Sequence, residues 1–143
     1  MKRQGPVTAR APERYPFKVK KSEIQGIGVF TLANLPRRRK IGEITGELVR
    51  LPQARKAIEH TERIYLVELT NRLALDCSRG NSLACVNHSC APNCYLRIIN
   101  TRVEMYTLRE IKAGTELTID YGVTPHANGM RCVCGVKHCR GKL

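Results

Sequence analysis

The sequence has no apolar run that approaches the roughly 20 residues of a membrane-spanning helix. Its N-terminus has no apolar centre of the kind found in secretory signals. Acidic residues are scarce, because 12 Asp and Glu stand against 25 Lys and Arg and leave a net charge of +13. We therefore expect no membrane association, and an intracellular protein of a bacterial cytoplasm or a nucleus, or an effector secreted into a host. The positive charge predicts attraction to nucleic acid or to assemblies that carry it, with direct phosphate contacts.

Cysteine, by contrast, is abundant. The chain has 143 residues, the length of one domain, and seven of them are cysteines. An odd number excludes complete disulfide pairing within the chain, and clustering of cysteines favours a metal site. Cys132, Cys134 and Cys139 supply three thiolates within eight residues, whereas a closed zinc site needs four ligands. The fourth ligand remains open among Cys77, Cys85, Cys90, Cys94 and His138.

Residues 1–16 have three prolines, four basic residues and little apolar content, which predicts a flexible basic arm. From Phe17 the sequence changes to short apolar runs separated by Gly and Pro, which is typical of short strands and turns. These runs are FKVK (17–20), IGVFTL (27–32), IGEITGELV (41–49), IYLVELT (64–70), LALD (73–76), YLRII (95–99), VEMYTL (103–108) and ELTI (116–119). A helical pattern covers residues 53–63, and a further turn is expected at 80–86. We therefore predict a mainly β fold with few short helices.

Two polar stretches contain most of the side chains that could bind a ligand or take part in a reaction. Residues 87–94 are NHSCAPNC, and residues 116–121 are ELTIDY. Asn87, His88 and Ser89 provide donors and acceptors that are costly to bury unpaired. We therefore expect them to bind a polar ligand, to lock a tight chain crossing, or both.

Three smaller features add to this pattern. Tyr121 ends an apolar run before Gly122, so its hydroxyl would stand beside a cleft, although a tyrosine in this place more commonly belongs to the core. Gly26 and Gly28 allow a sharp turn or a close approach to a ligand. The basic run at 37–40 follows a proline and predicts a surface turn, which is either solvated or bound to phosphate.

Taken in order, a set of stretches resembles the SET-domain protein lysine methyltransferases that carry a post-SET zinc segment. The stretches are KSEIQGIGVF (21–30), ITGELV (44–49), YLVEL (65–69), DCSRGN (76–81), NHSCAPNC (87–94), REIKAGTELTIDYG (109–122) and CVCGVKHC (132–139). The resemblance implies a SET domain of the β-clip type over residues 17–122 and a post-SET zinc-binding segment over residues 123–143. It also implies a C-terminal pseudoknot that brings the NHSC and ELTIDY stretches together.

The resemblance further implies S-adenosylmethionine as methyl donor, zinc as a bound metal, and Tyr121 as the active-site tyrosine. The residues implied for the donor pocket are Gln25, Gly26, Ile27, Tyr65, Asn87, His88 and Val133, the last against the adenine. The implied zinc ligands are Cys90, Cys132, Cys134 and Cys139, because the cysteine of NHSC has this role in the family. The residues implied for the substrate lysine channel are Ile44, Tyr106 and Ile119.

The implied function is protein-lysine N-methylation, with a histone or another nucleic-acid-associated protein as substrate. Ile44 stands where family members often have Tyr, and Ile119 stands where they commonly have Phe or Tyr. These apolar side chains favour di- or trimethylation. Ala84 and Cys85 stand where many members have Arg and Phe, and this departure bears on the substrate channel. Two alternatives are a SET-like binding module without catalysis and a small zinc-dependent nucleic-acid-binding protein. Retention of Tyr121 and Asn87 argues against the first, and the order of the motifs argues against the second.

Overall fold

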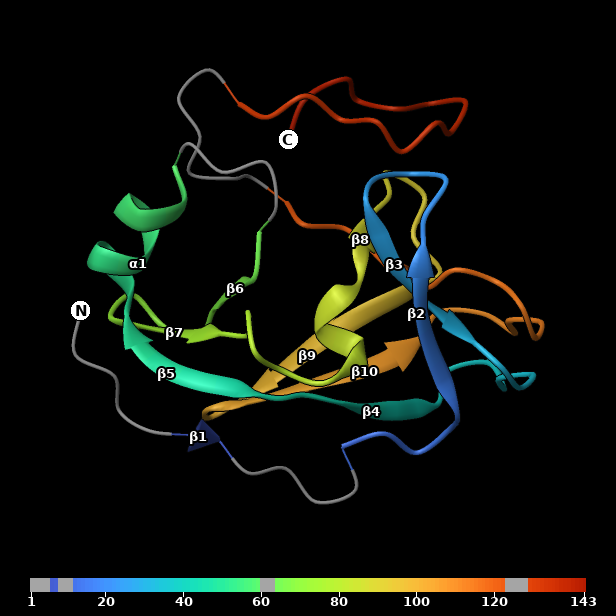
Figure 1. Cartoon of the computed structure of the whole chain (residues 1–143), viewed down its shortest axis with the longest axis horizontal. Coiled ribbons are helices and arrows are strands. Elements are labelled where there is room, and N and C mark those ends of the chain that lie inside the picture. The colour runs from blue at the N-terminus through green and yellow to red at the C-terminus, as the bar shows by residue number, and fades with distance from the viewer. Residues whose placement is uncertain (1–5, 8–11, 60–63, 123–128) are drawn as a thin grey trace.

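Short strands make up most of the regular secondary structure of the computed structural model, which describes residues 6–7, 12–59, 64–122 and 129–143 (Figure 1). The strands are β1 Pro6–Val7, β2 Phe17–Lys21, β3 Ile27–Thr31, β4 Lys40–Ile44, β5 Gly46–Arg50, β6 Leu66–Glu68, β7 Leu73–Asp76, β8 Asn87–His88, β9 Cys94–Ile99, β10 Arg102–Thr107 and β11 Thr118–Ile119. The helices of the described part are α1 Leu51–Ile58 and the short 3-10 helix η1 Ser82–Cys85. The predicted mainly β fold is confirmed.

The strands form four small sheets, with the orders β1-β5-β7-β6, β4-β10-β9, β11-β8 and β2-β3. β9 and β10 are joined by a tight turn at Asn100 and Thr101, where Asn100 adopts a φ of +55°. Asparagine tolerates this left-handed conformation better than most residues, so the sequence supports a hairpin here. The hairpin also pairs with β4, which places β10 in the middle of its sheet.

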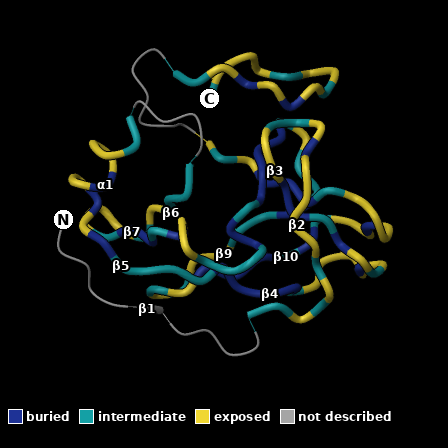
Figure 2. Tube along the Cα trace, in the orientation of Figure 1, coloured by how far each residue is buried: buried dark blue, intermediate teal, exposed yellow. Residues whose placement is uncertain are grey.

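The main hydrophobic core lies between these sheets. Its centre contains side chains with no solvent exposure, among them Val29 of β3, Leu75 of β7, and Val103 and Met105 of β10. Figure 2 shows the buried stretches of β4 and β10 passing through the middle of the molecule. The core therefore forms a rigid support beneath the polar residues of β8 and β11.

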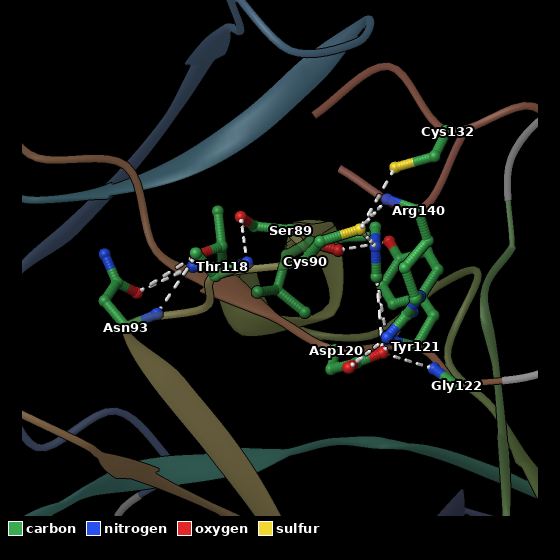
Figure 3. Close-up of polar contacts among 12 residues, drawn as sticks. Ser89, Cys90, Asn93, Thr118, Asp120, Tyr121, Gly122, Cys132 and Arg140 are labelled. Carbon is green, nitrogen blue, oxygen red and sulfur yellow. Dashed lines mark hydrogen bonds and ion pairs between the residues drawn. The ribbon is translucent and has the colours of Figure 1, made fainter. Parts of the chain in front are cut away.

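β8 and β11 come from distant parts of the sequence and pair in parallel, with Asn87 opposite Thr118. The side chain of Asn93 closes this crossing. Its Oδ1 accepts from the backbone N–H of Thr118 at 2.9 Å (Figure 3). Its Nδ2 donates to the carbonyl of Glu116 at 2.9 Å. The NHSC and ELTIDY stretches therefore meet in space, in agreement with the resemblance.

The N-terminal arm is attached to the sheets wherever the structure describes it. β1 pairs antiparallel with β5, and the carbonyl of Pro12 accepts from the N–H of Glu43 at 2.8 Å. Gly42 permits this approach, because a Cβ at Gly42 would lie 2.3 Å from the Pro12 carbonyl oxygen. Composition predicts a free arm, but the open backbone groups of β4 and β5 provide partners for it. Residues 1–5 and 8–11 lie outside the described residues.

α1 begins at Leu51, before the helix that the pattern predicts over residues 53–63. Pro52 fits the first turn, where its missing N–H has no intrahelical partner, and Leu51 faces the core. Residues 60–63 lie outside the described part of the chain. Among the described residues, no helix is long and apolar enough to cross a membrane.

Candidate active site and metal centre

Four cysteines converge from two parts of the chain. Cys90 follows β8, whereas Cys132, Cys134 and Cys139 belong to the C-terminal segment, and the four sulfur atoms lie within 4.8 Å of one another. The sulfurs of Cys90 and Cys132 are 3.7 Å apart. Tetrahedral zinc with Zn–S bonds of about 2.3 Å requires sulfurs about 3.8 Å apart. The cluster is therefore compatible with zinc, and it selects Cys90 among the candidates that spacing left open.

The surroundings of the cluster act on its thiols in opposite directions. Backbone N–H groups of Arg140 and Gly141 donate to the sulfurs of Cys90 and Cys139, each at 3.3 Å. Burial raises the pKa of Cys132 to about 12. At Cys134 the effect of burial is outweighed by hydrogen bonds from backbone N–H groups, and the pKa falls to about 6. A divalent cation among these sulfurs would keep them ionised.

The other cysteines lie outside the cluster. Cys77 and Cys94 are buried in the main core, where burial raises the pKa of each thiol to about 12. Such thiols remain protonated at neutral pH and behave as small apolar side chains. Cys85 is half-buried, and His138 is exposed.

The loop before β3 is held by two buried polar residues. Asn87 Nδ2 lies within hydrogen-bond distance of the carbonyls of Gln25 (3.1 Å) and Ile27 (3.0 Å) and of the Glu116 carboxylate (2.9 Å). The Ser22 hydroxyl also donates to Glu116. Gly28 is required here, because a Cβ at Gly28 would lie 2.1 Å from a Glu116 carboxylate oxygen. The Gly26-Ile27-Gly28 signal thus marks a backbone loop fixed by the two polar stretches.

A first pocket lies between this loop, β8 and the C-terminal segment. It is lined by Ile24, Gln25, Ile64, Asn87, His88, Tyr121, Met130, Arg131, Cys132, Val133, Cys134 and Leu143. Of the residues implied for the donor pocket, Gln25, Asn87, His88 and Val133 line it directly. Its volume is about 20 Å³, less than that of a nucleoside, and residues 130–134 supply part of its wall. Sequence reasoning assigned no role to five lining residues: Ile24, Ile64, Met130, Arg131 and Leu143.

A second pocket is an apolar groove of about 290 Å³. Its lining residues are Ile44, Ile58, Ile64, Leu66, Val67, Glu68, Cys77, Ala84, Val86, Leu96, Ile98, Ile119, Asp120 and Tyr121. Two of the residues implied for the lysine channel, Ile44 and Ile119, line the groove. Ala84 also lines it, so the departure from the family pattern at this position leaves a methyl group in the wall.

Four residues implied by the resemblance line neither pocket: Gly26, Ile27, Tyr65 and Tyr106. Tyr106 lines neither pocket, because its ring stacks on Tyr95 at 5.4 Å between centroids and its hydroxyl donates to Glu104. Tyr65 packs against the main core, and its neighbour Ile64 lines both pockets instead. The structure therefore does not bring Tyr106 and Tyr65 to the surfaces where the resemblance implies them.

Tyr121 and Ile64 line both pockets, so the first pocket and the apolar groove meet at Tyr121. The Tyr121 hydroxyl donates to the carbonyl of Val86 at 2.5 Å. The Tyr121 N–H donates to His88 Nδ1 at 2.9 Å, which leaves the proton of neutral His88 on Nε2, 3.3 Å from Cys90 Sγ. Burial lowers the pKa of His88, so this neutral form prevails at pH 7. His88 therefore connects Tyr121 with the cysteine cluster.

An ion pair also lies beside Tyr121. Arg140 donates to both oxygens of the Asp120 carboxylate, at 2.8 and 2.9 Å (Figure 3). The hydrogen bonds from Arg140 hold the pKa of Asp120 down to about 2 in spite of its partial burial. Sequence reasoning missed both residues, although Asp120 belongs to the ELTIDY stretch and Arg140 follows Cys139.

A family model of the SET domain matches residues 26–122, more than half of the chain. The chain belongs to the SET-domain family. The match includes Asn87, His88, Cys90 and Tyr121, whereas Cys132, Cys134 and Cys139 lie beyond it. The SET domain thus contributes one cysteine to the cluster, and the C-terminal segment contributes the other three.

Several named SET-domain proteins are similar to this chain. It is 33% identical over 132 residues to the Schizosaccharomyces pombe "Histone-lysine N-methyltransferase, H3 lysine-4 specific", covering 85% of this chain and 14% of that protein. It is 37% identical over 135 residues to the Arabidopsis thaliana histone-lysine N-methyltransferase ATX2, covering 85% and 12%. It is 34% identical over 134 residues to the Arabidopsis thaliana histone H3-lysine(4) N-trimethyltransferase ATX1, again covering 85% and 12%. The chain therefore spans less than a fifth of the length of these relatives.

Proposed function

We propose that this SET domain transfers methyl groups from S-adenosylmethionine to a lysine of a histone or another nucleic-acid-associated protein. The observation that carries the proposal is the position of Tyr121, where the first pocket and the apolar groove meet. Membership of the family and the names of the relatives support methyl transfer to lysine. A donor in the first pocket and a lysine in the groove would meet at this tyrosine.

The residues around the first pocket suit the donor. Asn87 holds the Gln25 and Ile27 carbonyls, which fixes the backbone of this loop, and Gln25 and Asn87 line the pocket where the amino acid part of the donor would lie. Val133 also lines the pocket and is 41% exposed, and an apolar side chain in this place suits the flat face of adenine. The cofactor pocket is therefore assigned to the loop over residues 25–27, to Asn87 and His88, and to Val133. The zinc ligands are assigned to the four clustered cysteines.

The groove addresses the main obstacle to methylating lysine. Only a neutral amine attacks a methyl group, and deprotonating a lysine of pKa ~10.4 at pH 7 costs about 4.6 kcal/mol. Apolar walls such as Ile44 and Ile119 would desolvate the ammonium and lower its pKa. The donor supplies an electrophilic methyl group on a positively charged sulfur, which further disfavours a second positive charge. The fixed hydroxyl of Tyr121 orients the amine without acting as a base.

Radiolabelled S-adenosylmethionine provides the direct test. The protein is incubated with nucleosomes, with free histone H3 and with an H3 tail peptide, since relatives are named for H3 lysine-4. Label on a lysine, located by mass spectrometry, supports the proposal. Donor binding in a calorimeter without transfer to any lysine substrate would favour the catalytically inactive binding module. Absence of donor binding would leave the small zinc-dependent nucleic-acid-binding protein.

A basic turn provides a surface for the nucleic acid around the substrate. Arg37, Arg38 and Arg39 between β3 and β4 are exposed, and none forms an ion pair with the described residues. The buried hydroxyl of Thr107 fixes the turn, since it donates to the Pro36 carbonyl at 2.6 Å and accepts from the Arg39 N–H at 2.9 Å. A preorganised turn with free guanidinium groups suits phosphate oxygens. We therefore assign direct phosphate contacts to these arginines.

Changing all three arginines to alanine should weaken binding to a short DNA duplex. Each lost phosphate contact removes about 0.9 from the slope of log K against log salt, so the slope should fall by about 2.7. Fluorescence anisotropy at several salt concentrations measures both quantities. A matched control replaces three exposed basic residues near α1, at the other end of the molecule in Figure 1: Arg50, Lys56 and Arg72. Equal slopes for the two triple variants would remove the assignment.

Methylation of nucleosomes should depend on the same three arginines. Because the chain carries a charge of +13, we expect it to repel a free basic peptide and to prefer the peptide within a nucleic acid assembly. If the free peptide is methylated as well as the assembled substrate at low salt, this preference does not exist. A histone substrate places the protein in the nucleus, and the comparisons do not support a bacterial or secreted location.

The groove favours more than one methyl group on the lysine. Among its described lining residues, only Tyr121 bears a hydroxyl, while Ile44 and Ile119 are 2% and 6% exposed. A water that restricts a methylated amine has few partners there, and each methyl buried against apolar walls gains roughly 0.8 kcal/mol. The name of the Arabidopsis trimethyltransferase ATX1 agrees with this direction. We therefore propose di- or trimethyllysine as the product.

Ile119→Tyr should shift the end product toward monomethyllysine, because the added hydroxyl can hold a water in the groove. Ile119→Phe is the matched control, since it adds the ring without the hydroxyl and should retain di- or trimethylation. Mass spectrometry of exhaustively reacted substrate gives the distribution of products. A monomethyl end point for the unmodified protein would contradict the argument.

A further inference from the structure

Arg140 touches both the cysteine cluster and the strand end that carries Tyr121. Its backbone N–H donates to Cys90 Sγ at 3.3 Å. Its guanidinium donates to both carboxylate oxygens of Asp120, the residue before Tyr121 (Figure 3). One residue of the C-terminal segment therefore connects the metal centre with the reacting centre.

Asp120, Tyr121 and Gly122 are each held by a different contact. Asp120 is held by Arg140, and its Oδ1 also accepts from the N–H of Gly122 at 2.8 Å. The Tyr121 N–H donates to His88, and Gly122 adopts a φ of +71°, a conformation that favours glycine. The Asp120 carboxylate thus spans the backbone of Tyr121 and fixes the direction of its side chain.

We propose that Arg140 and Asp120 form a clasp that positions Tyr121 when the cysteine cluster is assembled. The inference rests on the proposed methyl transfer and adds positioning residues to it. His88 provides the second connection, because its ring joins Cys90 and the backbone of Tyr121. Loss of the cluster would release both connections at once. The C-terminal segment would then close over the donor at the same time as Tyr121 is aligned.

The exposure of the Arg140–Asp120 ion pair indicates that it contributes to positioning Tyr121 and not to the stability of the fold. The side chains of Arg140 and Asp120 are 45% and 39% exposed. Exposed ion pairs add little to the stability of a folded protein, because water screens the charges. Removing the Arg140 side chain also leaves its backbone N–H on Cys90, so the cluster keeps that hydrogen bond. The expected loss is therefore in turnover and in local order, with the fold and the metal retained.

Arg140→Ala should lower kcat about tenfold, since even small misplacement of a reacting group is costly. The KM for peptide, the zinc content and the unfolding temperature should stay close to those of the unmodified protein. Hydrogen exchange of residues 120–122, measured by mass spectrometry, should become about tenfold faster as this turn opens more often. Arg140→Lys keeps the charge but loses the paired geometry, and it should recover part of kcat. Arg79→Ala removes another exposed arginine–carboxylate pair, which lines neither pocket, and should change none of these quantities.

Asp120→Asn completes the test, because the amide oxygen can still accept from Gly122 while the charge is lost. If the two residues act as one clasp, the double variant loses no more activity or protection than Arg140→Ala alone. Losses that multiply, or unchanged exchange at residues 120–122 in Arg140→Ala, overturn the clasp. Exchange requires no methyl transfer, so it decides the clasp even if the unmodified protein methylates no lysine.

Discussion

Tyr121→Phe should lower kcat at least about 100-fold while changing the dissociation constant of S-adenosylmethionine less than about threefold. The hydroxyl stands where the two pockets meet and is fixed on the carbonyl of Val86 at 2.5 Å. Phenylalanine fills the same volume, so the ring contact with His88 at 5.5 Å between centroids should persist. What the variant removes is the group that orients the amine, which acts in turnover rather than in donor binding.

Turnover with saturating donor and calorimetric titration of the donor measure the two effects separately. Tyr95→Phe is a suitable control, because Tyr95 stacks on Tyr106 and lines neither pocket. The free energy of unfolding of Tyr121→Phe should fall by about 1 kcal/mol, the usual net contribution of one hydrogen bond. Equal losses in turnover and donor affinity would indicate that Tyr121 only packs.

Cys134→Ser should release the zinc, disorder the C-terminal segment and abolish methyl transfer, while the core remains folded. Structural zinc contributes on the order of 10 kcal/mol to the folding of small peptides, and this segment has few other supports. Its described backbone pairs are those of Met130 with Leu143, Cys132 with Gly141 and Cys139 with Val136. The main core contains none of its residues, so the strands should survive without it.

Metal content by mass spectrometry, together with hydrogen exchange of residues 129–143, tests this expectation. Cys85→Ser makes the same chemical change outside the cluster and should retain one zinc per chain. Chelation of the unmodified protein should likewise remove activity before it unfolds the core. A Cys134→Ser protein that still contains one zinc per chain, or unmodified protein purified without chelators and free of zinc, would refute the metal assignment.

The strands were predictable because alternation and turn residues are local signals. The hairpin at Asn100 and the end of β5 before Pro52 are examples in which nearby residues suffice. β8 was not predictable from pattern, since it has two residues and exists only because β11 lies beside it. The attachment of β1 depends likewise on the open edge of β5, which lies some forty residues away in sequence.

In the candidate site, too, contacts between residues far apart in the sequence could not be predicted from local patterns. Spacing alone could not choose Cys90 over Cys94, and only the resemblance selected it before the structure brought the four sulfurs together. The pairing of Asp120 with Arg140 was hidden because an exposed aspartate in a chain with 25 basic residues has many candidate partners. Tyr106, which the resemblance implies for the lysine channel, stacks on Tyr95 and lines neither pocket.

Ser22 binds Glu116, and Arg140 binds Asp120, so the contacts around the site join residues that are far apart in the sequence. This separation affects the order in which the parts of the site can form during synthesis. A chain leaving the ribosome can form the hairpin of β9 and β10 early, because its partners are adjacent. The loop before β3 must wait for Asn87 and Glu116, and the surroundings of Tyr121 must wait for Arg140. Such separated contacts make folding slow. A nascent chain therefore cannot complete this site until Arg140 has been synthesised, and a fragment that ends between Tyr121 and Arg140 lacks the contact that holds Asp120.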